Sequence, residues 1–179
     1  MSAAHIAIQK VGTYGSTERL PVGTIHRDTE GRGWEYVRFV DAITYKRGHV
    51  VSWRNPAIGT RSVTNDESLG NDIPAGALPT DRRVVTAVVP VENDYGWMQF
   101  EGPHPAVAKT AGDDTWASGD AVIMHASADG EADPASDANE PTAADRARMI
   151  GRVLGDDEAT TTGTYDEDTV PINLNCRAS

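Results

Sequence analysis

The apolar residues of this chain fall into short runs, each bounded by glycine, proline or small polar residues. Runs of five to seven residues that are rich in β-branched and aromatic side chains are typical of β-strands. The sequence therefore predicts an all-β fold: a small β-barrel or β-sandwich body with an extended N-terminal arm and long loops. Strands are expected over residues 34–40, 49–53, 84–89, 95–100, 121–125, 149–154 and 169–174.

The last of these runs alternates most clearly. Val170, Ile172 and Leu174 are separated by polar residues or proline, which places three apolar side chains on one face of a strand. Pro171 has no backbone N–H to donate. This strand is therefore expected either to be an edge strand or to pair on one side only at that residue.

A single segment has the features of a helix. Thr142 is followed three residues later by Asp145, a pattern that resembles a capping box. Gly151 limits any helix that starts here to about two turns.

The rest of the chain is organised by its loops. Residues 1–20 have no sustained period and are predicted to form an extended arm, and residues 21–179 a single β-rich domain. Residues 54–81 and 126–139 are predicted to be loops, the first of them a contact surface between molecules because long loops are usually functional. Residues 45–53 and 116–124 share a pattern of an aromatic residue, a glycine and an apolar run. This pattern predicts two similar turn-into-strand units in one barrel or sandwich.

Charge is distributed unevenly along the chain. The net charge of −11 arises from 16 basic and 27 acidic residues. Residues 1–90 carry 11 basic and 9 acidic residues (+2), whereas residues 91–179 carry 5 and 18 (−13). An acidic half of this kind repels phosphate groups, which argues against nucleic acid and anionic membranes as partners. The scarcity of lysine fits either adaptation to high salt or a GC-rich genome.

Motifs for catalysis are not found in the sequence. It contains no G-x-S-x-G elbow and no phosphate-binding P-loop, and none of the five histidines pairs with another at i,i+4. We therefore predict that the chain is not an enzyme and has no cofactor, no metal and no catalytic residue. A small barrel enzyme with a site assembled from distant residues is a less favoured alternative. Cys176 is the single cysteine and is interpreted as an incidental thiol.

Two groups of residues leave binding functions open. Asp129, Glu131, Asp133 and Asp137 form an acidic cluster, and residues 156–158 and 166–168 form two more. Such loops can bind calcium, but none has EF-hand spacing, so solvated acidic loops are favoured. The aromatic residues gather in 34–53 and 95–100. If exposed, they would suit a carbohydrate-binding or adhesion module of a virion or cell surface, whereas a core or subunit interface is favoured.

The order of these strand and turn motifs resembles that of the small head decoration (cement, capsid-stabilising) proteins of tailed bacterial and archaeal viruses. The motifs are GRGWEYVRFV (31–40), KRGHVVSW (46–53), YGWMQFEG (95–102), WASGDAVIM (116–124) and MIGRVLG (149–155). The resemblance covers about residues 31 to 175. The long 54–81 loop and the acidic second half depart from it.

This resemblance implies a structural virion protein on the outer surface of the capsid, made in the host cytoplasm. Its expected partners are the major capsid protein and further copies of itself, as a homotrimer at local three-fold positions. Decoration proteins commonly grip the capsid with an extended N-terminal arm. The apolar arm residues expected to contact the capsid or a neighbouring subunit are Ile6, Ile8, Val11, Tyr14 and Leu20.

Overall fold

The computed structural model describes residue 11 and residues 13–41, 44–54, 61–66, 68–79, 89–109, 116–135, 142–154 and 169–176. Half of these residues (50%) are in strands and only 5% in helix, which confirms the all-β prediction. The strands are β1 (Ile25–Arg27), β2 (Gly33–Phe39), β3 (Val50–Arg54), β4 (Ser62–Thr64), β5 (Gly70–Ala77), β6 (Tyr95–Ala108), β7 (Ala121–Met124), β8 (Ala132–Pro134), β9 (Met149–Val153) and β10 (Thr169–Asn175).

Five of these strands close into a barrel. They are hydrogen-bonded in the order β2, β4, β3, β5 and β6, and β6 pairs with β2 to complete the ring. The β2–β4 pair is parallel and the other pairs are antiparallel. A barrel of so few strands is filled by its own side chains. Its core cluster contains Val37, Phe39, Val51, Val63 and Met98, all of them buried.

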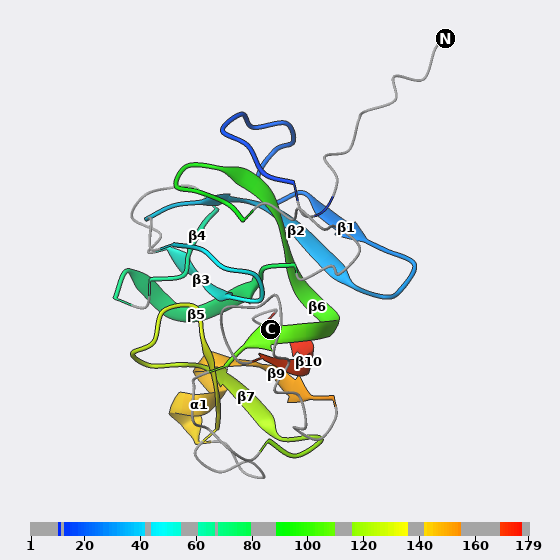
Figure 1. Cartoon of the computed structure of the whole chain (residues 1–179), viewed down its shortest axis with the longest axis vertical. Helices are drawn as coiled ribbons and strands as arrows, with labels where there is room; N and C mark the ends of the chain where they lie inside the picture. Colours follow the sequence, from blue (N-terminus) through cyan, green and yellow to red (C-terminus); the bar gives the residue numbers. More distant parts are fainter. Residues whose placement is uncertain are drawn as a thin grey trace.

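The long strand β6 connects this barrel to a second group of strands. Its first half pairs with β2, and its second half pairs with β10. The sheet then continues through β9 and β7 to β8, and a bridge between Lys109 and Ala132 links β8 back to the end of β6. A second core of Trp116, Val122, Ile150 and other apolar residues lies mainly within this group. Figure 1 shows β1–β5 above β7, β9 and β10.

The expected strands agree largely with the observed ones. Those over 34–40, 49–53, 95–100, 121–125, 149–154 and 169–174 are confirmed as β2, β3, β6, β7, β9 and β10. The strand expected over 84–89 lies outside the described residues except for its last residue, which is not in a strand.

The two loop predictions were wrong in part. Residues 54–81 contain β4 and β5, and residues 126–139 contain β8. β5 includes a proline and two glycines, which lower its intrinsic preference for strand. A Cβ atom at Gly76 would lie only 2.3 Å from the carbonyl oxygen of Gln99 on β6. The backbones of β5 and β6 can therefore pack this closely only with a glycine at position 76. This pairing holds the segment as a strand although its sequence resembles that of a loop.

The edge-strand alternative for residues 169–174 was also wrong. β10 lies between β6 and β9 in the sheet. At Pro171 the register against β6 shifts, and the Pro171 carbonyl accepts a hydrogen bond of 2.9 Å from the Leu154 N–H. The second alternative, pairing on one side at this residue, agrees with that geometry. The irregularity accommodates a residue that cannot donate.

Two smaller predictions are confirmed. The turn-into-strand units place Gly48 and Gly119 at positive φ (77° and 91°), and β3 and β7 begin two residues later. The two units do not share the closed barrel, however, because β3 belongs to it and β7 lies outside it. The helix α1 (Ala143–Arg148) follows a capping box made by Thr142 and Asp145. No helix among the described residues is long and apolar enough to cross a membrane.

Candidate functional site

The N-terminal segment, described at residue 11 and residues 13–20, covers an aromatic patch on the outside of the barrel. Alternation along β2 directs Trp34 and Tyr36 outward, where Trp97 of β6 joins them. All three side chains are buried because Val11 and Leu20 pack against them. The Tyr36 hydroxyl also accepts a hydrogen bond of 3.3 Å from a backbone N–H of this segment. The patch is therefore part of the folded body.

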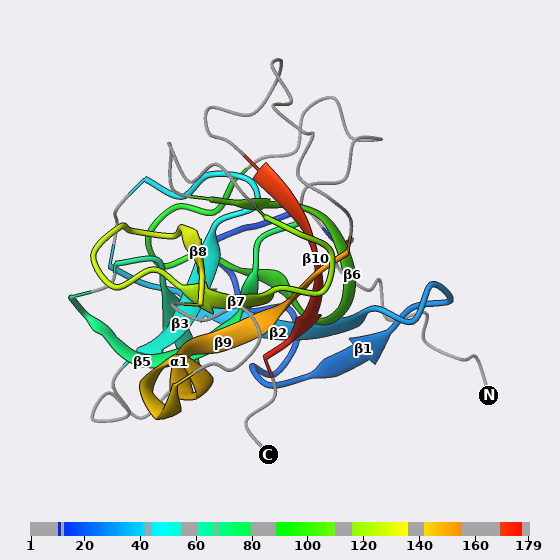
Figure 2. The same ribbon diagram turned by 90° about the horizontal axis from the view of Figure 1, so that it is seen from below.

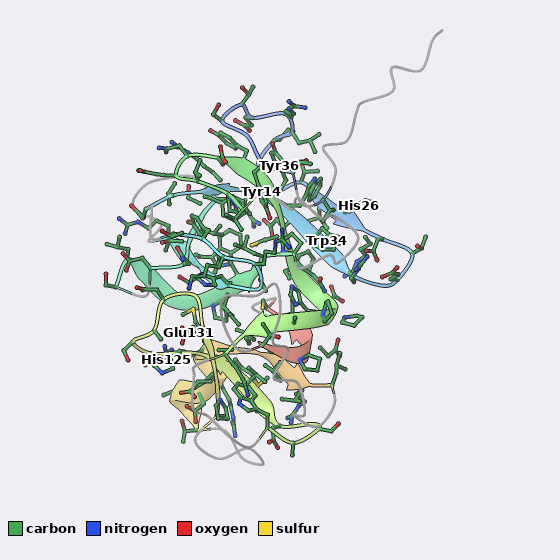
Figure 3. All side chains as sticks on the ribbon, in the orientation of Figure 1. Tyr14, His26, Trp34, Tyr36, His125 and Glu131 are labelled. Carbon is green, nitrogen blue, oxygen red and sulfur yellow. The ribbon has the colours of Figure 1, made fainter. Side chains whose placement is uncertain are left out.

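Tyr14 of the same segment packs elsewhere on the barrel. Its ring meets that of Phe39 edge-on, with the centroids 5.4 Å apart. Gly15 exchanges backbone hydrogen bonds with Tyr95 at 3.2 and 2.9 Å, which fixes the segment against the start of β6. Figure 3 shows Tyr14 in the upper half of the molecule, close to Tyr36 in that view.

These contacts locate three of the five arm residues expected to meet a partner. Val11, Tyr14 and Leu20 contact this chain's own barrel, whereas Ile6 and Ile8 lie outside the described residues. The arm hypothesis for a partner contact thus rests mainly on residues 1–10.

The β1–β2 hairpin projects from the body in both views (Figures 1 and 2). Asp28 organises its turn by accepting hydrogen bonds from Arg32 Nε (2.7 Å), Trp34 Nε1 (3.0 Å) and the backbone N–H of Glu30 (2.9 Å). Partial burial raises the pKa of Asp28, but the bonds from Trp34 and Arg32 outweigh burial and lower it to about 2. The carboxylate thus has a structural role in the turn.

A cavity of about 360 Å³ lies beside this hairpin. Its walls are formed by β1, by the barrel and by the residue that follows β10. They are about equally polar and apolar, with one buried carboxylate and one guanidinium among the polar groups. The lining residues are Ile25, Glu35, Trp53, Arg61, Ala75, Phe100 and Cys176.

The polar groups of the cavity satisfy one another. Glu35 is buried and forms an ion pair with Arg61, whose side chain is partly exposed. The Arg61 guanidinium lies 5.4 Å from the centre of the Trp53 ring, a cation–π contact. Because Arg61 already pairs with this carboxylate, a group that enters the cavity would contact its apolar residues rather than an unpaired charge.

His104 and Cys176 are buried titratable groups whose surroundings shift their pKa values. His104 forms a hydrogen bond of 3.0 Å through Nε2 to the Leu78 carbonyl, and burial lowers its pKa to about 4. Burial raises the pKa of the Cys176 thiol to about 12. An imidazole with a pKa near 4 is a weak base at neutral pH, and a protonated thiol is a weak nucleophile.

The acidic clusters give no metal site among the residues that the structure describes. Asp133 lies 3.9 Å from His125, while Asp137 and the groups at 156–158 and 166–168 lie outside the described residues. The aromatic side chains are not exposed in the described ranges. Trp34, Trp97 and Trp116 are buried, and the other aromatic residues described are buried or half-buried. They do not form the exposed platform that stacking on sugar rings requires.

The comparisons with known proteins give no relative. No protein-family model matches the sequence, and no curated protein or solved structure matches the chain.

Proposed function

We propose that this chain is a structural virion protein that binds the outer surface of a tailed-virus capsid and stabilises it without catalysis. The order of its motifs supports this proposal, as does a barrel body with an N-terminal segment fixed along its outside. The partner is the major capsid protein, with further copies of this chain completing a trimer.

The observation that carries the proposal is that the two halves of the sequence differ in charge and contribute mainly to different parts of the fold. Tyr14 lies in the upper half of Figure 3, whereas His125 and Glu131 lie in the lower half. Strands β1–β5 come from the half of the sequence with charge +2 and β7–β10 from the half with charge −13, whereas the barrel strand β6 comes from the second half. Burying a nearly neutral surface costs less desolvation than burying many carboxylates. The first half of the sequence is thus suited to face a shell, and the acidic second half to face water.

The buried polar groups support a role without turnover. Among the described residues, several buried ionisable groups have partners or surroundings of a structural kind: Glu35 pairs with Arg61, His104 bonds the Leu78 carbonyl, and burial raises the pKa of Cys176. Perturbed groups at active sites are usually poised for proton transfer instead.

The mechanism is repeated burial. One interface of ordinary size contributes several kcal/mol, and hundreds of copies over a shell add their contributions. The shell then resists internal pressure although no single contact is strong.

Co-sedimentation with shells of the cognate major capsid protein tests this proposal. Thr17→Glu adds a carboxylate to an exposed position of the N-terminal segment, and Ala144→Glu adds one to the exposed side of α1 as a matched control. We expect the first variant to lose occupancy at least about fivefold and the control to bind as the parent does. Absence of binding by the parent, or an equal loss in both variants, would refute the proposal.

The mass in solution tests the trimer separately. Light scattering at low and at molar salt should give about three times the chain mass of 19.2 kDa. A monomer in both salts would contradict a trimer that is stable away from the capsid.

A further inference from the structure

The outer edge of β1 pairs with no other strand in the part of the chain that the structure describes. Within that part, β1 is the terminal strand of the ten-stranded sheet and pairs with β2. All three of its residues are exposed, and the apolar side chain of Ile25 is 48% exposed. An open strand edge is a template for another strand, and proteins usually cover it or blunt it.

The hydrogen bonds of the hairpin show which groups face outward. The Tyr36 N–H donates to the Thr24 carbonyl, and the Asp28 N–H donates to the Arg32 carbonyl. An antiparallel ladder forms bonds at every second residue, so the backbone of Ile25 points away from β2. The backbone N–H and C=O of Arg27, two residues later along β1, also point away from β2. These N–H and C=O groups are placed to bond an added strand.

The cavity lies on the face of the sheet that carries the side chains of Ile25 and Glu35. Ile25 stands opposite Glu35 in the register, and both line the cavity. Directly opposed residues of neighbouring strands have side chains on the same face. A residue added opposite Ile25 would therefore direct its side chain toward the cavity, whose wall includes Phe100 and Ala75.

The N-terminal sequence has the pattern that such a strand requires. Ile6 and Ile8 are two residues apart and share a face in an extended chain, with Ala7 on the other face. Residues 4–9 (AHIAIQ) contain no acidic residue and no proline, so neither repulsion from Glu35 nor a missing N–H opposes pairing.

The position of Val11 favours a strand from another molecule. Val11 packs against Trp34, Tyr36 and Trp97, on the face of β2 opposite to the face that carries Glu35. An extended chain advances about 3.3 Å per residue, so Ile8 can be only about 10 Å from Val11. To reach its own cavity the chain would have to reverse around β1 within that length. A neighbouring copy has no such restriction.

We propose that residues 4–9 of a second copy add as a strand to the free edge of β1, with Ile6 and Ile8 entering the cavity. The exchange links copies of this chain to one another. It does not depend on capsid binding, and its test uses the purified full-length protein alone.

Disulfide trapping in a mixture of two variants tests the exchange. Both carry Cys176→Ser, so that each has only its introduced cysteine; one adds Ile6→Cys and the other Ile25→Cys. After mild oxidation we expect a disulfide-linked pair of the two variants. Replacing Ile25→Cys by Glu30→Cys, at an exposed turn position of the hairpin, gives the control and should lower the yield at least about tenfold.

Two results would overturn the proposal. The first is a yield of linked pairs no higher than that of the control. The second is a bond that forms only within one chain, in a variant that carries both Ile6→Cys and Ile25→Cys at high dilution.

A second pair of variants changes only the arm. Ile6→Asp should lower the assembly mass measured by light scattering, whereas Ala7→Asp adds the same charge on the opposite face and should retain it. Equal masses for the two variants would count against the predicted facing of the strand.

Discussion

Gly48 and Gly119 occupy equivalent positions in two similar hydrogen-bonded frames, one in each half of the molecule. Gly48 donates its N–H to the Leu78 carbonyl at 3.2 Å, and Gly119 donates to the Val153 carbonyl at 2.9 Å. In each case the acceptor residue donates in return to the carbonyl of the residue that follows the glycine, at 2.9 and 3.0 Å. The short sequence similarity between 45–53 and 116–124 therefore corresponds to one backbone arrangement used twice.

The positive φ of Gly119 gives the first prediction. No atom lies within 4 Å of the place where a Cβ would be, so substitution by alanine adds backbone strain without a clash. We expect Gly119→Ala to lower the free energy of unfolding by about 1–2 kcal/mol, measured by urea denaturation. Gly15→Ala is the control, because its Cβ also meets nothing and its φ is not in the left-handed region. Equal stability of Gly119→Ala and the parent would contradict the role of this turn.

The second prediction concerns where the arm ends. At concentrations where the protein is monomeric, deleting residues 1–10 should lower the free energy of unfolding much less than deleting residues 1–20, because Val11 and Leu20 are retained. Deleting residues 1–20 should lower it by several kcal/mol, since Trp34, Tyr36 and Trp97 lose their cover. Thermal melts of the two truncations measure the difference. If the longer deletion melts like the shorter one, residues 11–20 do not belong to the folded body.

A point substitution in the same segment sharpens this test. Tyr14→Ala removes the edge contact with Phe39 and should cost about 2 kcal/mol. Thr17→Ala, at an exposed position, should cost less than about 0.5 kcal/mol.

Much of the fold could be predicted because β-branched and aromatic runs report strands directly. β2, β3 and β7 are short apolar runs beside a turn glycine, and local sequence is enough to identify them. β5 was missed because its pairing depends on Gly76 lying against the backbone of Gln99, a contact between residues far apart in the chain. The barrel closure of β2 with β6 is long-range in the same way.

The candidate site was less accessible to sequence reasoning. Tyr14 and Leu20 were identified as apolar contacts, but their partners in the barrel depend on which face of β2 is outward. The cavity was missed altogether, because Ile25, Trp53 and Cys176 come from distant parts of the chain. Ile25 did carry one signal, since it is a large apolar residue in a polar, turn-rich segment.

The third prediction follows from the burial of Cys176. Burial raises the pKa of this thiol to about 12, so little of the reactive thiolate is present at pH 8. We expect a soluble disulfide reagent to label the native protein at least about a hundredfold more slowly than the protein in denaturant. Ser118→Cys on a Cys176→Ser background places a thiol at an exposed position and should react at similar rates in both conditions. Rapid labelling of native Cys176 would show that the end of β10 opens readily.

The last prediction is a pH dependence of stability caused by His104. Burial lowers the pKa of this imidazole from 6.5 to about 4, while its Nε2–H donates to the Leu78 carbonyl. In the unfolded chain the imidazole takes up a proton near pH 6.5, but in the folded protein it does so only near pH 4. The stability that depends on neutral His104 is therefore fully present above pH 6.5 and is lost as the pH falls toward 4, by about 3 kcal/mol in all.

Urea denaturation at several pH values between 7 and 4 measures this loss, and two variants isolate its source. His104→Gln removes the titration and keeps an N–H for the Leu78 carbonyl, so its stability should fall less steeply over this range than that of the parent. His26→Gln changes an exposed histidine and should retain the steep dependence of the parent. Carboxylates that titrate near pH 4 affect all three proteins equally, so the difference between the curves reports His104 alone. Parallel curves for the parent and His104→Gln would mean that the imidazole gains or loses its proton equally in the folded and unfolded states.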